Sequence, residues 1–395
     1  MLSHEENKTV SSIVSSDSYA WKSQRAWVEI NLAALSNNIA QICKLLGAKT
    51  QFMAVVKADA YGHGAVSVAQ TALKAGASWL GVATVPEGIE LREAGIKAPI
   101  LVLGATYTPE QVEAIARWKL EATLCDCKQA LIFSDILETI NFESTLQVHL
   151  KLDTGMSRLG TLWQDCSEFV QLVDRLPHLN IQSVYSHLAT ADSPDRTVMD
   201  LQHQRFESAI ALLKDVGIEL PCLHLANSAG TLSDNSLHYD MVRVGLAIYG
   251  FYPSPHLRST VHLQPVLEVK SRVTHVKTIE KGAGVSYGHT FVAGKQMRLA
   301  VVGIGYADGV PRNLSNKMQV LIRGVKVPQI GNITMDQIML DVSSIPDVEE
   351  GEIVTILGCE GAEQITAEDW STQLNTISWE ILCSFKHRLP RVNVS

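Results

Sequence analysis

From Phe52 to about Gly250 the sequence alternates short apolar runs with amphipathic stretches, and this alternation restricts the possible folds. Strands that alternate with helices predict a parallel sheet, because each helical crossover returns the chain to the same edge. Eight such units in succession predict a closed (β/α)8 barrel of the TIM type, with an open doubly wound sheet as the alternative. The expected strands are Phe52–Val56, Trp79–Ala83, Ile100–Leu103, Ala122–Leu124, Leu146–Leu152, Ile181–Tyr185, Leu223–Ala226 and Met241–Val244.

Beyond the eighth unit the pattern changes to short strand-like runs separated by turn glycines, without intervening helices. Val266–Lys277 alternates between apolar and polar residues, and Gln337–Val342 and Ile353–Leu357 have the length of strands. This pattern predicts an all-β second domain. Trp27–Leu32 alternates weakly and is a candidate strand of the same domain.

The expected fold class is therefore α/β: a TIM-type barrel followed by a mainly β C-terminal domain. The barrel is expected at 34–263, and the β-rich domain combines 25–33 with 264–395. Residues 1–24 are polar and lack helical or strand periodicity. We expect them to form a disordered N-terminal extension.

Composition excludes several classes of partner. The net charge is -8 and no basic run stands out, so neither nucleic acid nor an anionic membrane surface is an expected partner. No stretch approaches the ~20 apolar residues of a membrane span, and the first residues lack a secretory signal. The seven cysteines are scattered, which is typical of reduced thiols in a cytoplasmic protein. The histidine spacing predicts no metal site.

The segment Val55–Gly64, VVKADAYGHG, carries the clearest chemical signal. An apolar strand runs directly into Lys57, and a loop with two glycines follows. Catalytic groups of such barrels lie at the C-terminal ends of the strands. A lysine held there against apolar walls is a usable amine nucleophile, whereas a lysine that extends into solvent is the structural alternative.

This segment closely resembles the cofactor-lysine motif of alanine racemases, which are fold type III pyridoxal-phosphate enzymes. The resemblance extends from about Arg25 to Val392 and includes long motifs in both expected domains. In the barrel these are Lys151–Gly160, Ser186–Asp192, His224–Ser228 and Arg243–Gly245. In the β-rich domain they are Val285–Gly288, Gly305–Gly309, Gly331–Gln337 and Leu389–Val392.

The resemblance implies that Lys57 holds pyridoxal 5'-phosphate covalently. Tyr61, Ser228 and the backbone of Gly245 match the family's phosphate ligands, and Asn227 lies beside them in the motif. Ser228 and Gly245 follow the seventh and eighth expected strands, where barrels commonly bind phosphate. A helix N-cap is the alternative role of Ser228.

Arg243 matches the arginine that faces the cofactor's pyridine nitrogen in the family. A guanidinium donates a hydrogen bond there and keeps that nitrogen unprotonated. His187 matches the residue that hydrogen-bonds the second base, with Arg243 behind it. The alternatives are a structural histidine at a strand end and an arginine paired with an acid such as Asp240.

Tyr287 matches the family's second base. Racemisation removes a proton from one face of a carbon and delivers one to the other, which two fixed bases achieve without moving. A packed strand aromatic is the alternative role. The resemblance also implies a head-to-tail homodimer, in which Tyr287 of one protomer serves Lys57 of the other.

Further residues match the substrate site and its entrance. Arg158 and Met335 correspond to groups near the cofactor hydroxyl and the substrate carboxylate, and an arginine suits a carboxylate. Lys151 aligns with a lysine that is carbamylated in some members, which would make it an anion able to fix Arg158. The residues that match the substrate corridor are Tyr306, Asp192 and Arg312.

Two positions depart from the family pattern. Trp379 stands near the phosphate site where the family usually has tyrosine, and an indole donates a hydrogen bond but accepts none. Asn332 stands where some members have arginine, so the corridor loses a charge. Neither departure affects the expected proton-transfer pair.

The resemblance implies interconversion of L-alanine and D-alanine, which in a bacterium supplies D-alanine for peptidoglycan. A racemase of broader scope, acting on serine or other small amino acids, is the nearest alternative. A pyridoxal-phosphate decarboxylase on the same plan lacks the Val285–Gly288 motif. A non-catalytic pyridoxal-phosphate carrier protein resembles the barrel alone, and the β-rich domain argues against it.

Overall fold

The computed structural model describes residues 24–219 and 222–394. The extension expected at 1–24 therefore lies, apart from Gln24, outside the described residues. The chain divides into two compact units. One comprises Asn31–Val266, where the sequence predicts 34–263, and the other comprises the described residues up to Ile30 together with Leu267–Val394.

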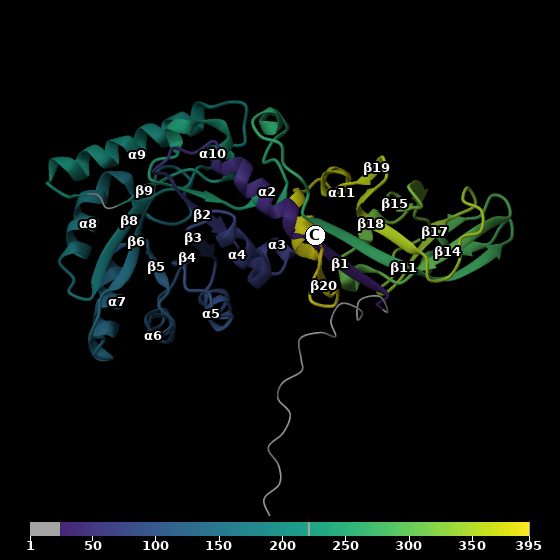
Figure 1. Ribbon diagram of the computed structural model, residues 1–395, viewed down its shortest axis with the longest axis horizontal. Coiled ribbons are helices and arrows are strands. Elements are labelled where there is room, and N and C mark those ends of the chain that lie inside the picture. Colours follow the sequence, from purple (N-terminus) through teal and green to yellow (C-terminus); the bar gives the residue numbers. More distant parts are fainter. Residues whose placement is uncertain (1–23, 220–221, 395) are drawn as a thin grey trace, which may run out of the picture. The chain divides into compact units, whose positions relative to one another are not determined.

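Eight parallel strands form the centre of the first unit (Figure 1). Their order around the sheet is β10-β2-β3-β4-β5-β6-β8-β9, and the short β7 (Thr161–Leu162) pairs with β6. The backbone N–H groups of Asp240 and Arg243 donate to Leu223 O and Ala226 O, both at 3.0 Å, and so join the two ends of this order. The predicted barrel is confirmed, and the open doubly wound sheet is excluded. The strands are β2 (Gln51–Val55), β3 (Trp79–Val82), β4 (Ile100–Ala105), β5 (Glu121–Leu124), β6 (Leu146–Asp153), β8 (Leu179–Tyr185), β9 (Leu223–His224) and β10 (Met241–Val244).

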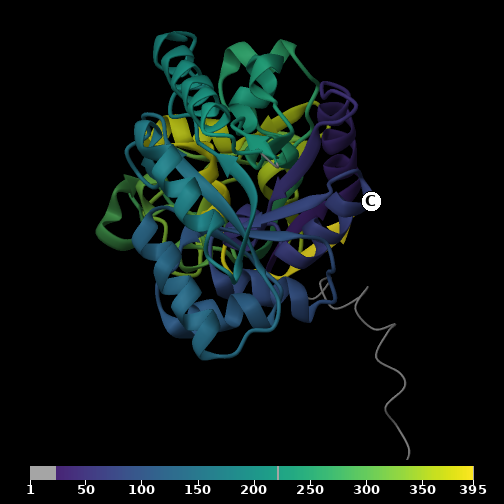
Figure 2. The ribbon, with the colours of Figure 1, turned by 90° about the vertical axis from the view of Figure 1, so that its left-hand side faces the viewer.

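Helices cover the outside of these strands (Figure 2). Their starts follow ordinary capping rules: Thr84 and Glu87 form a capping box for α5, and Thr108 accepts from Gln111 N at the start of α6. No helix in the described part of the chain has both the length and the apolar character needed to cross a membrane. The helices are α2 (Leu32–Cys43), α3 (Lys57–Gly62), α4 (Ala65–Lys74), α5 (Val85–Glu93), α6 (Pro109–Arg117), α7 (Cys127–Thr139), α8 (Cys166–Asp174), α9 (Thr197–Asp215) and α10 (Ser228–Ser233).

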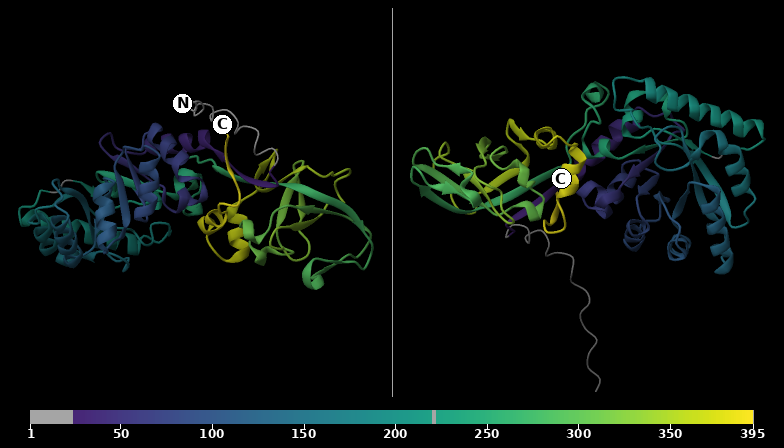
Figure 3. Two further views of the ribbon diagram at one scale, coloured as in Figure 1. Left: turned by 90° about the horizontal axis from the view of Figure 1, so that it is seen from below. Right: turned by 180° about the vertical axis from the view of Figure 1, so that it is seen from behind.

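The second unit is mainly β, as predicted, and Figure 3 shows it from two further sides. Its larger sheet has the order β16-β15-β18-β11-β1-β20; in addition, β14 pairs with β11, β17 with β14 and β19 with β18. The early segment joins this sheet, because β1 pairs antiparallel with β11. The strands are β1 (Ala26–Asn31), β11 (Leu267–Ile279), β12 (Gly284–Val285), β13 (Phe291–Val292), β14 (Met297–Val302), β15 (Gln319–Ile322), β16 (Val325–Pro328), β17 (Ile338–Asp341), β18 (Ile353–Glu360), β19 (Glu363–Ile365) and β20 (Arg391–Val394).

The expectation that this unit contains no helices is wrong near its C-terminal end. Two helices occur there, α11 (Ala367–Leu374) and α12 (Ser378–Ser384). A capping box of Thr366 and Asp369 starts α11. This pair is a sequence signal for a helix start that the strand pattern overshadowed.

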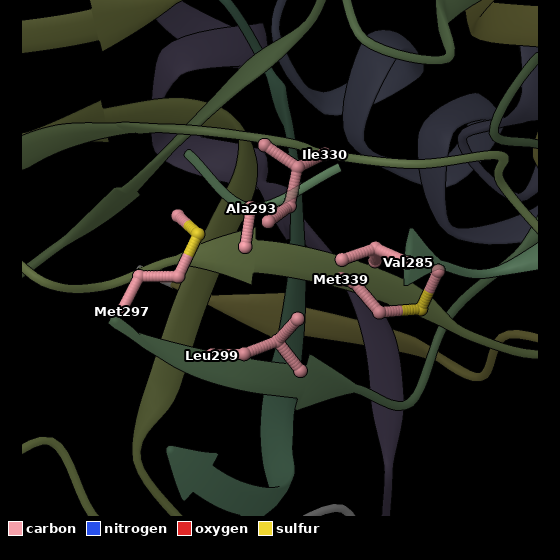
Figure 4. Packing of buried hydrophobic residues seen from close by; sticks show 6 residues of the cluster. All are labelled: Val285, Ala293, Met297, Leu299, Ile330 and Met339. Carbon is pink, nitrogen blue, oxygen red and sulfur yellow. The ribbon is translucent and has the colours of Figure 1, made fainter. Parts of the chain in front are cut away.

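A compact apolar cluster supports the loops of the second unit (Figure 4). Val285 and Ile330 each immediately precede a motif loop, and both side chains are buried in the cluster. Fixing the last residue before each loop restricts the positions that the loop can take. The cluster consists of Val285, Ala293, Met297, Leu299, Ile330 and Met339.

Candidate active site

Lys57 follows β2 at the C-terminal end of the barrel strands and is half-buried. The turn that it begins, α3, is left-handed: four consecutive residues from Ala58 to Tyr61 have φ between 52° and 55°. None of the four is glycine, and a left-handed conformation costs roughly 1–2 kcal/mol for each such residue. Strain of this size persists only where the surrounding structure holds it.

Hydrogen bonds from neighbouring elements hold the left-handed turn. Glu87 of α5 accepts from Ala58 N at 2.8 Å and from Ala83 N at 2.7 Å. Asp59 accepts from Ala65 N, the first residue of α4, at 2.7 Å. The turn is therefore fixed at both ends.

The C-terminal ends of the parallel strands form the mouth of the barrel. One side of this barrel mouth brings together Tyr61, Ser228 and Gly245. A Cβ on Gly245 would lie 2.7 Å from the Tyr61 hydroxyl, so only glycine allows this approach. Ser228 Oγ accepts from Gly245 N at 3.0 Å, which leaves its hydroxyl hydrogen for another partner. Asn227 caps α10, accepting from Gly230 N, and thereby orients Ser228. The N-cap role is thus filled by Asn227 and not by Ser228.

Arg243 is buried near the end of β10 and pairs with no acid in the described part of the chain. Its guanidinium donates to Ser186 O at 2.7 Å and Leu225 O at 3.1 Å. It also lies 2.9 Å from His224 Nδ1 and 3.3 Å from His187 Nδ1. Burial lowers the pKa of Arg243 to about 10, so the side chain stays charged near neutral pH.

His187 lies in a cluster of cations. Burial, followed by four positive charges, holds the pKa of His187 well below its usual range. The imidazole is therefore neutral near pH 7, as a hydrogen-bond partner of Arg243 must be. The four cations are Arg243, Lys151, Arg158 and Lys57.

Lys151 is buried within the same cluster. Its Nζ lies over the Tyr185 ring, 5.1 Å from the centroid, and forms no hydrogen bond within the described chain. Burial and then the charges of Arg243 and Arg158 lower the pKa of Lys151 to about 8. The barrel mouth thus concentrates positive charge, which favours an anionic ligand.

Two further barrel residues lie near the mouth. Arg158 is exposed in the loop after β6, close enough for its charge to act on Lys151 and His187. Asp192 is exposed in the loop after β8.

Tyr287 belongs to the second unit, where it is 74% exposed. It is therefore not the packed strand aromatic that was its structural alternative. Asn332 donates through Nδ2 to Tyr287 O at 2.7 Å, and Ser286 Oγ donates to Asn332 O at 2.7 Å. This reciprocal pair fixes the backbone of the tyrosine and leaves its side chain exposed.

Tyr306 and Met335 are joined through their backbones. Tyr306 N donates to Thr334 O at 3.0 Å, and Ala307 N donates to Met335 O at 3.1 Å. A Cβ on Gly305 would lie 2.3 Å from Thr334 O, so glycine is required for this contact. Both side chains are partly exposed, at 43% for Tyr306 and 52% for Met335.

A cavity of about 520 Å³ lies between the Tyr306 turn and α12. Glu380 and Lys386 contribute opposite charges to its lining. Trp379 is half-buried on α12. Arg312 is exposed in the short turn that comes after the Tyr306 turn in the chain.

Of the sequence-predicted residues, the structure brings together Arg243 and His187, and separately Tyr61, Ser228 and Gly245. Sequence reasoning assigned no role to four buried polar residues of the barrel interior, namely His224, Ser183, His149 and Glu121. The period of two along a strand was the available signal, since it places His149 on the same face as Lys151. Among the described residues, no group of His, Cys, Asp or Glu is arranged to hold a metal ion.

Comparisons with known proteins cover both units. A sequence model described as "Alanine racemase, N-terminal domain" matches residues 30–253, and one described as "Alanine racemase, C-terminal domain" matches 266–393. An alanine racemase of Nostoc sp. is 71% identical over 378 residues, covering 96% of this chain and 98% of that protein. An alanine racemase of Synechocystis sp. is 60% identical over 369 residues, covering 93% of this chain and 99% of that protein.

Solved structures give the same result. The crystal structure of alanine racemase from Bacillus anthracis with bound L-Ala-P has a TM-score of 0.89 at 35% identity, covering 94% of this chain and 95% of that chain. The structure of alanine racemase from Clostridium difficile 630 also has a TM-score of 0.89 at 35% identity, covering 94% of this chain and 96% of that chain.

Proposed function

The chain belongs to the alanine racemase family, and from that premise we propose that it interconverts L-alanine and D-alanine with pyridoxal 5'-phosphate as cofactor. The observation that carries the proposal is the barrel mouth, where Lys57 follows β2 and where a buried arginine and a pair of hydroxyls also lie. We further propose a cytoplasmic enzyme that supplies D-alanine for peptidoglycan. A carrier protein of the barrel alone is disfavoured, because the matches include the C-terminal domain.

The residues at the barrel mouth fit the proposed cofactor. The Tyr61 and Ser228 hydroxyls beside Gly245 have the donor chemistry that a phosphate accepts. The cationic cluster offsets the phosphate charge. Arg243 has only donors, so it suits an unprotonated ring nitrogen. Lys57 would hold the cofactor through its amine, with Asn227 and Trp379 as further neighbours.

The cofactor, when bound, supplies an electron-withdrawing ring that weakens the covalent bond between the α-carbon of the amino acid and its hydrogen. In the proposed mechanism, Lys57 Nζ transfers a proton at one face of the α-carbon. The Tyr287 hydroxyl transfers a proton at the opposite face. His187, neutral and hydrogen-bonded to Arg243, orients the tyrosine hydroxyl. Two fixed bases avoid the movement that a single base would need.

We assign the tyrosine to a second protomer. Three large side chains with proposed roles, Tyr287, Tyr306 and Met335, are exposed on the second unit. The loop that carries Asn332 and Met335 hydrogen-bonds to the turns of both tyrosines, so the three residues form one surface. Exposed aromatic and methionine side chains are typical of a surface that a partner completes. The proposed assembly is a homodimer with two shared sites.

Arg158 and Lys151 are proposed to hold the substrate carboxylate. Arg158 is the exposed cation of the cluster, and a guanidinium suits a carboxylate. The backbone of Met335 is proposed as a second group for the same carboxylate. A buried Lys151 whose pKa is lowered to about 8 has a substantial neutral fraction near that pH. A neutral amine adds carbon dioxide and releases a proton, which gives a carbamate anion. We propose that this carbamate fixes Arg158.

The function is tested with a panel of L-amino acids in deuterated water, scoring exchange of the α-proton. We expect L-alanine to exchange and to yield D-alanine, whereas a preference for serine would indicate the broader racemase. Lys57→Ala should abolish both the bound cofactor's visible absorbance and racemisation. Retention of both by Lys57→Ala would refute the proposed role of Lys57.

A further inference from the structure

A chain of buried hydrogen bonds crosses the barrel interior from Glu121 to Arg243. Glu121 Oε2 lies 2.6 Å from His149 Nε2, and His149 Nδ1 lies 2.6 Å from Ser183 Oγ. Ser183 Oγ lies 2.8 Å from His224 Nε2, and His224 Nδ1 lies 2.9 Å from Arg243 Nη1. The five residues come from β5, β6, β8, β9 and β10, so each link joins adjacent strands.

The chemistry of the two ends determines the direction of every bond. A guanidinium has no acceptor, so His224 Nδ1 must accept and His224 Nε2 carries the proton. Ser183 Oγ accepts that proton and donates its single hydrogen to the Nδ1 of a neutral His149, since no third partner within the described chain contacts this oxygen. A protonated His149 would donate to Ser183 as well and leave the hydroxyl hydrogen without an acceptor. His149 Nε2–H then donates to the Glu121 carboxylate, which has acceptors only.

Because the chain is buried, reversing the direction of its hydrogen bonds would cost free energy. His149, Ser183 and His224 are fully buried, and Glu121 is 9% exposed. The Tyr185 ring stacks on His224 at 4.6 Å and prevents it from rotating freely. If the chain reversed, His224 Nδ1–H would face an Arg243 N–H, and two buried donors would oppose each other. Such a contact costs the desolvation of both groups.

We propose that Glu121 is a positioning residue for Arg243: its carboxylate orients the chain through His149, Ser183 and His224, and so fixes the guanidinium at the barrel mouth. The proposal rests on the proposed function only for its effect on the cofactor and the reaction. Lys151 and His187 also surround Arg243, and Arg92 lies within electrostatic reach of Glu121. These three residues remain unchanged in the test variants.

Glu121→Gln separates orientation from packing. The amide can present either its oxygen or its NH2 group to His149, so residue 121 no longer selects the tautomer of His149, while Arg243 still requires His224 Nδ1 to accept. The change in side-chain volume is small. Ser183→Ala interrupts the chain while leaving Glu121 in place. Glu113→Gln, at an exposed position on α6, is the matched control.

The first measurement uses protein labelled with 15N-histidine, with signals assigned by replacing one histidine at a time. We expect both His149 and His224 to carry their proton on Nε2 in the wild type, and His149 of the Glu121→Gln protein to populate the other tautomer. A proton on Nδ1 of His224 in the wild type would overturn the proposal. This readout requires neither cofactor nor activity, so it separates failure of the chain from failure of the proposed function.

The second measurement is a double-mutant cycle on the absorbance spectrum of the bound cofactor and on kcat/KM. Partners that orient metal-ligating histidines typically contribute about 10- to 100-fold, and we expect about tenfold from each single variant. If Glu121 acts through Ser183, the double variant is no worse than Ser183→Ala alone. Multiplying losses, or an unchanged spectrum and kcat/KM in Glu121→Gln, would contradict the proposal. Glu113→Gln should match the wild type in both readouts.

Discussion

Asn332 Nδ2 donates a 2.7 Å hydrogen bond to the carbonyl oxygen of Tyr287, and so fixes the backbone of the proposed second base. The short amide side chain thus holds the turn that carries the tyrosine. Together with the Ser286–Asn332 bond, it closes a small ring around the turn.

Asn332→Ala should therefore impair catalysis without affecting cofactor binding. A net hydrogen bond contributes about 1 kcal/mol, so we expect kcat to fall about fivefold. Cofactor occupancy, measured by absorbance, should not change. Asn180→Ala, which removes one exposed hydrogen bond to Gln147 on the barrel, is the control. Equal losses in both variants would show that Asn332 has no particular effect on Tyr287.

Gly245→Ala should weaken binding of the cofactor phosphate. Its Cβ would approach the Tyr61 hydroxyl to 2.7 Å, so the tyrosine must move away from Ser228. Loss of one charge-assisted hydrogen bond predicts an affinity about tenfold lower, measured by titrating the protein with pyridoxal phosphate. Gly294→Ala adds the same methyl group where nothing lies within 4 Å and should bind normally. Unchanged affinity in Gly245→Ala would show that the phosphate is not bound by Tyr61 and Ser228 beside Gly245.

Lys151 should make stability depend on alkaline pH. Its pKa falls from 10.5 to about 8 in the folded state, so between these values the unfolded chain binds more protons. The free energy of unfolding contributed by this group therefore rises with pH over that window, by about 3 kcal/mol in total. Denaturant unfolding in carbonate-free buffer should show the rise in wild type and not in Lys151→Met. Lys128→Met, exposed on α7, should keep the wild-type slope.

Carbamylation of the same amine predicts a separate signal. With 13C-bicarbonate present, the wild type should show a carbamate resonance that Lys151→Met lacks. The resonance should weaken as pH falls below about 8, because protonation removes the reacting amine. If the wild type and Lys151→Met gave identical spectra, an unmodified lysine would remain beside Arg158.

The barrel could be predicted because its signals are local. Each buried parallel strand is an apolar run, and helix starts such as Thr84 and Thr108 carry recognisable caps. The strand limits differ by a few residues where a neighbouring element competes. The expected strand Leu223–Ala226 shortens to Leu223–His224 because Asn227 already serves as the cap of α10.

The local geometry of the site could not be predicted in the same way. Nothing in the residues Ala58–Tyr61 favours a left-handed turn, which depends on Glu87 from another helix. The partners of Arg243 lie on three different strands and loops, so sequence spacing does not reveal them. The family motifs include Arg243 and His187 but not Glu121.

The shared site itself can be tested with two inactive variants. Lys57→Ala and Tyr287→Phe are co-expressed so that mixed dimers form. If each site takes its lysine from one protomer and its tyrosine from the other, every mixed dimer contains one intact site.

Random pairing then restores about a quarter of the wild-type racemase activity, although each variant alone is inactive. Restoration near that level is the result we predict. Mixed dimers that form and remain as inactive as the parent variants would contradict a site built from two subunits.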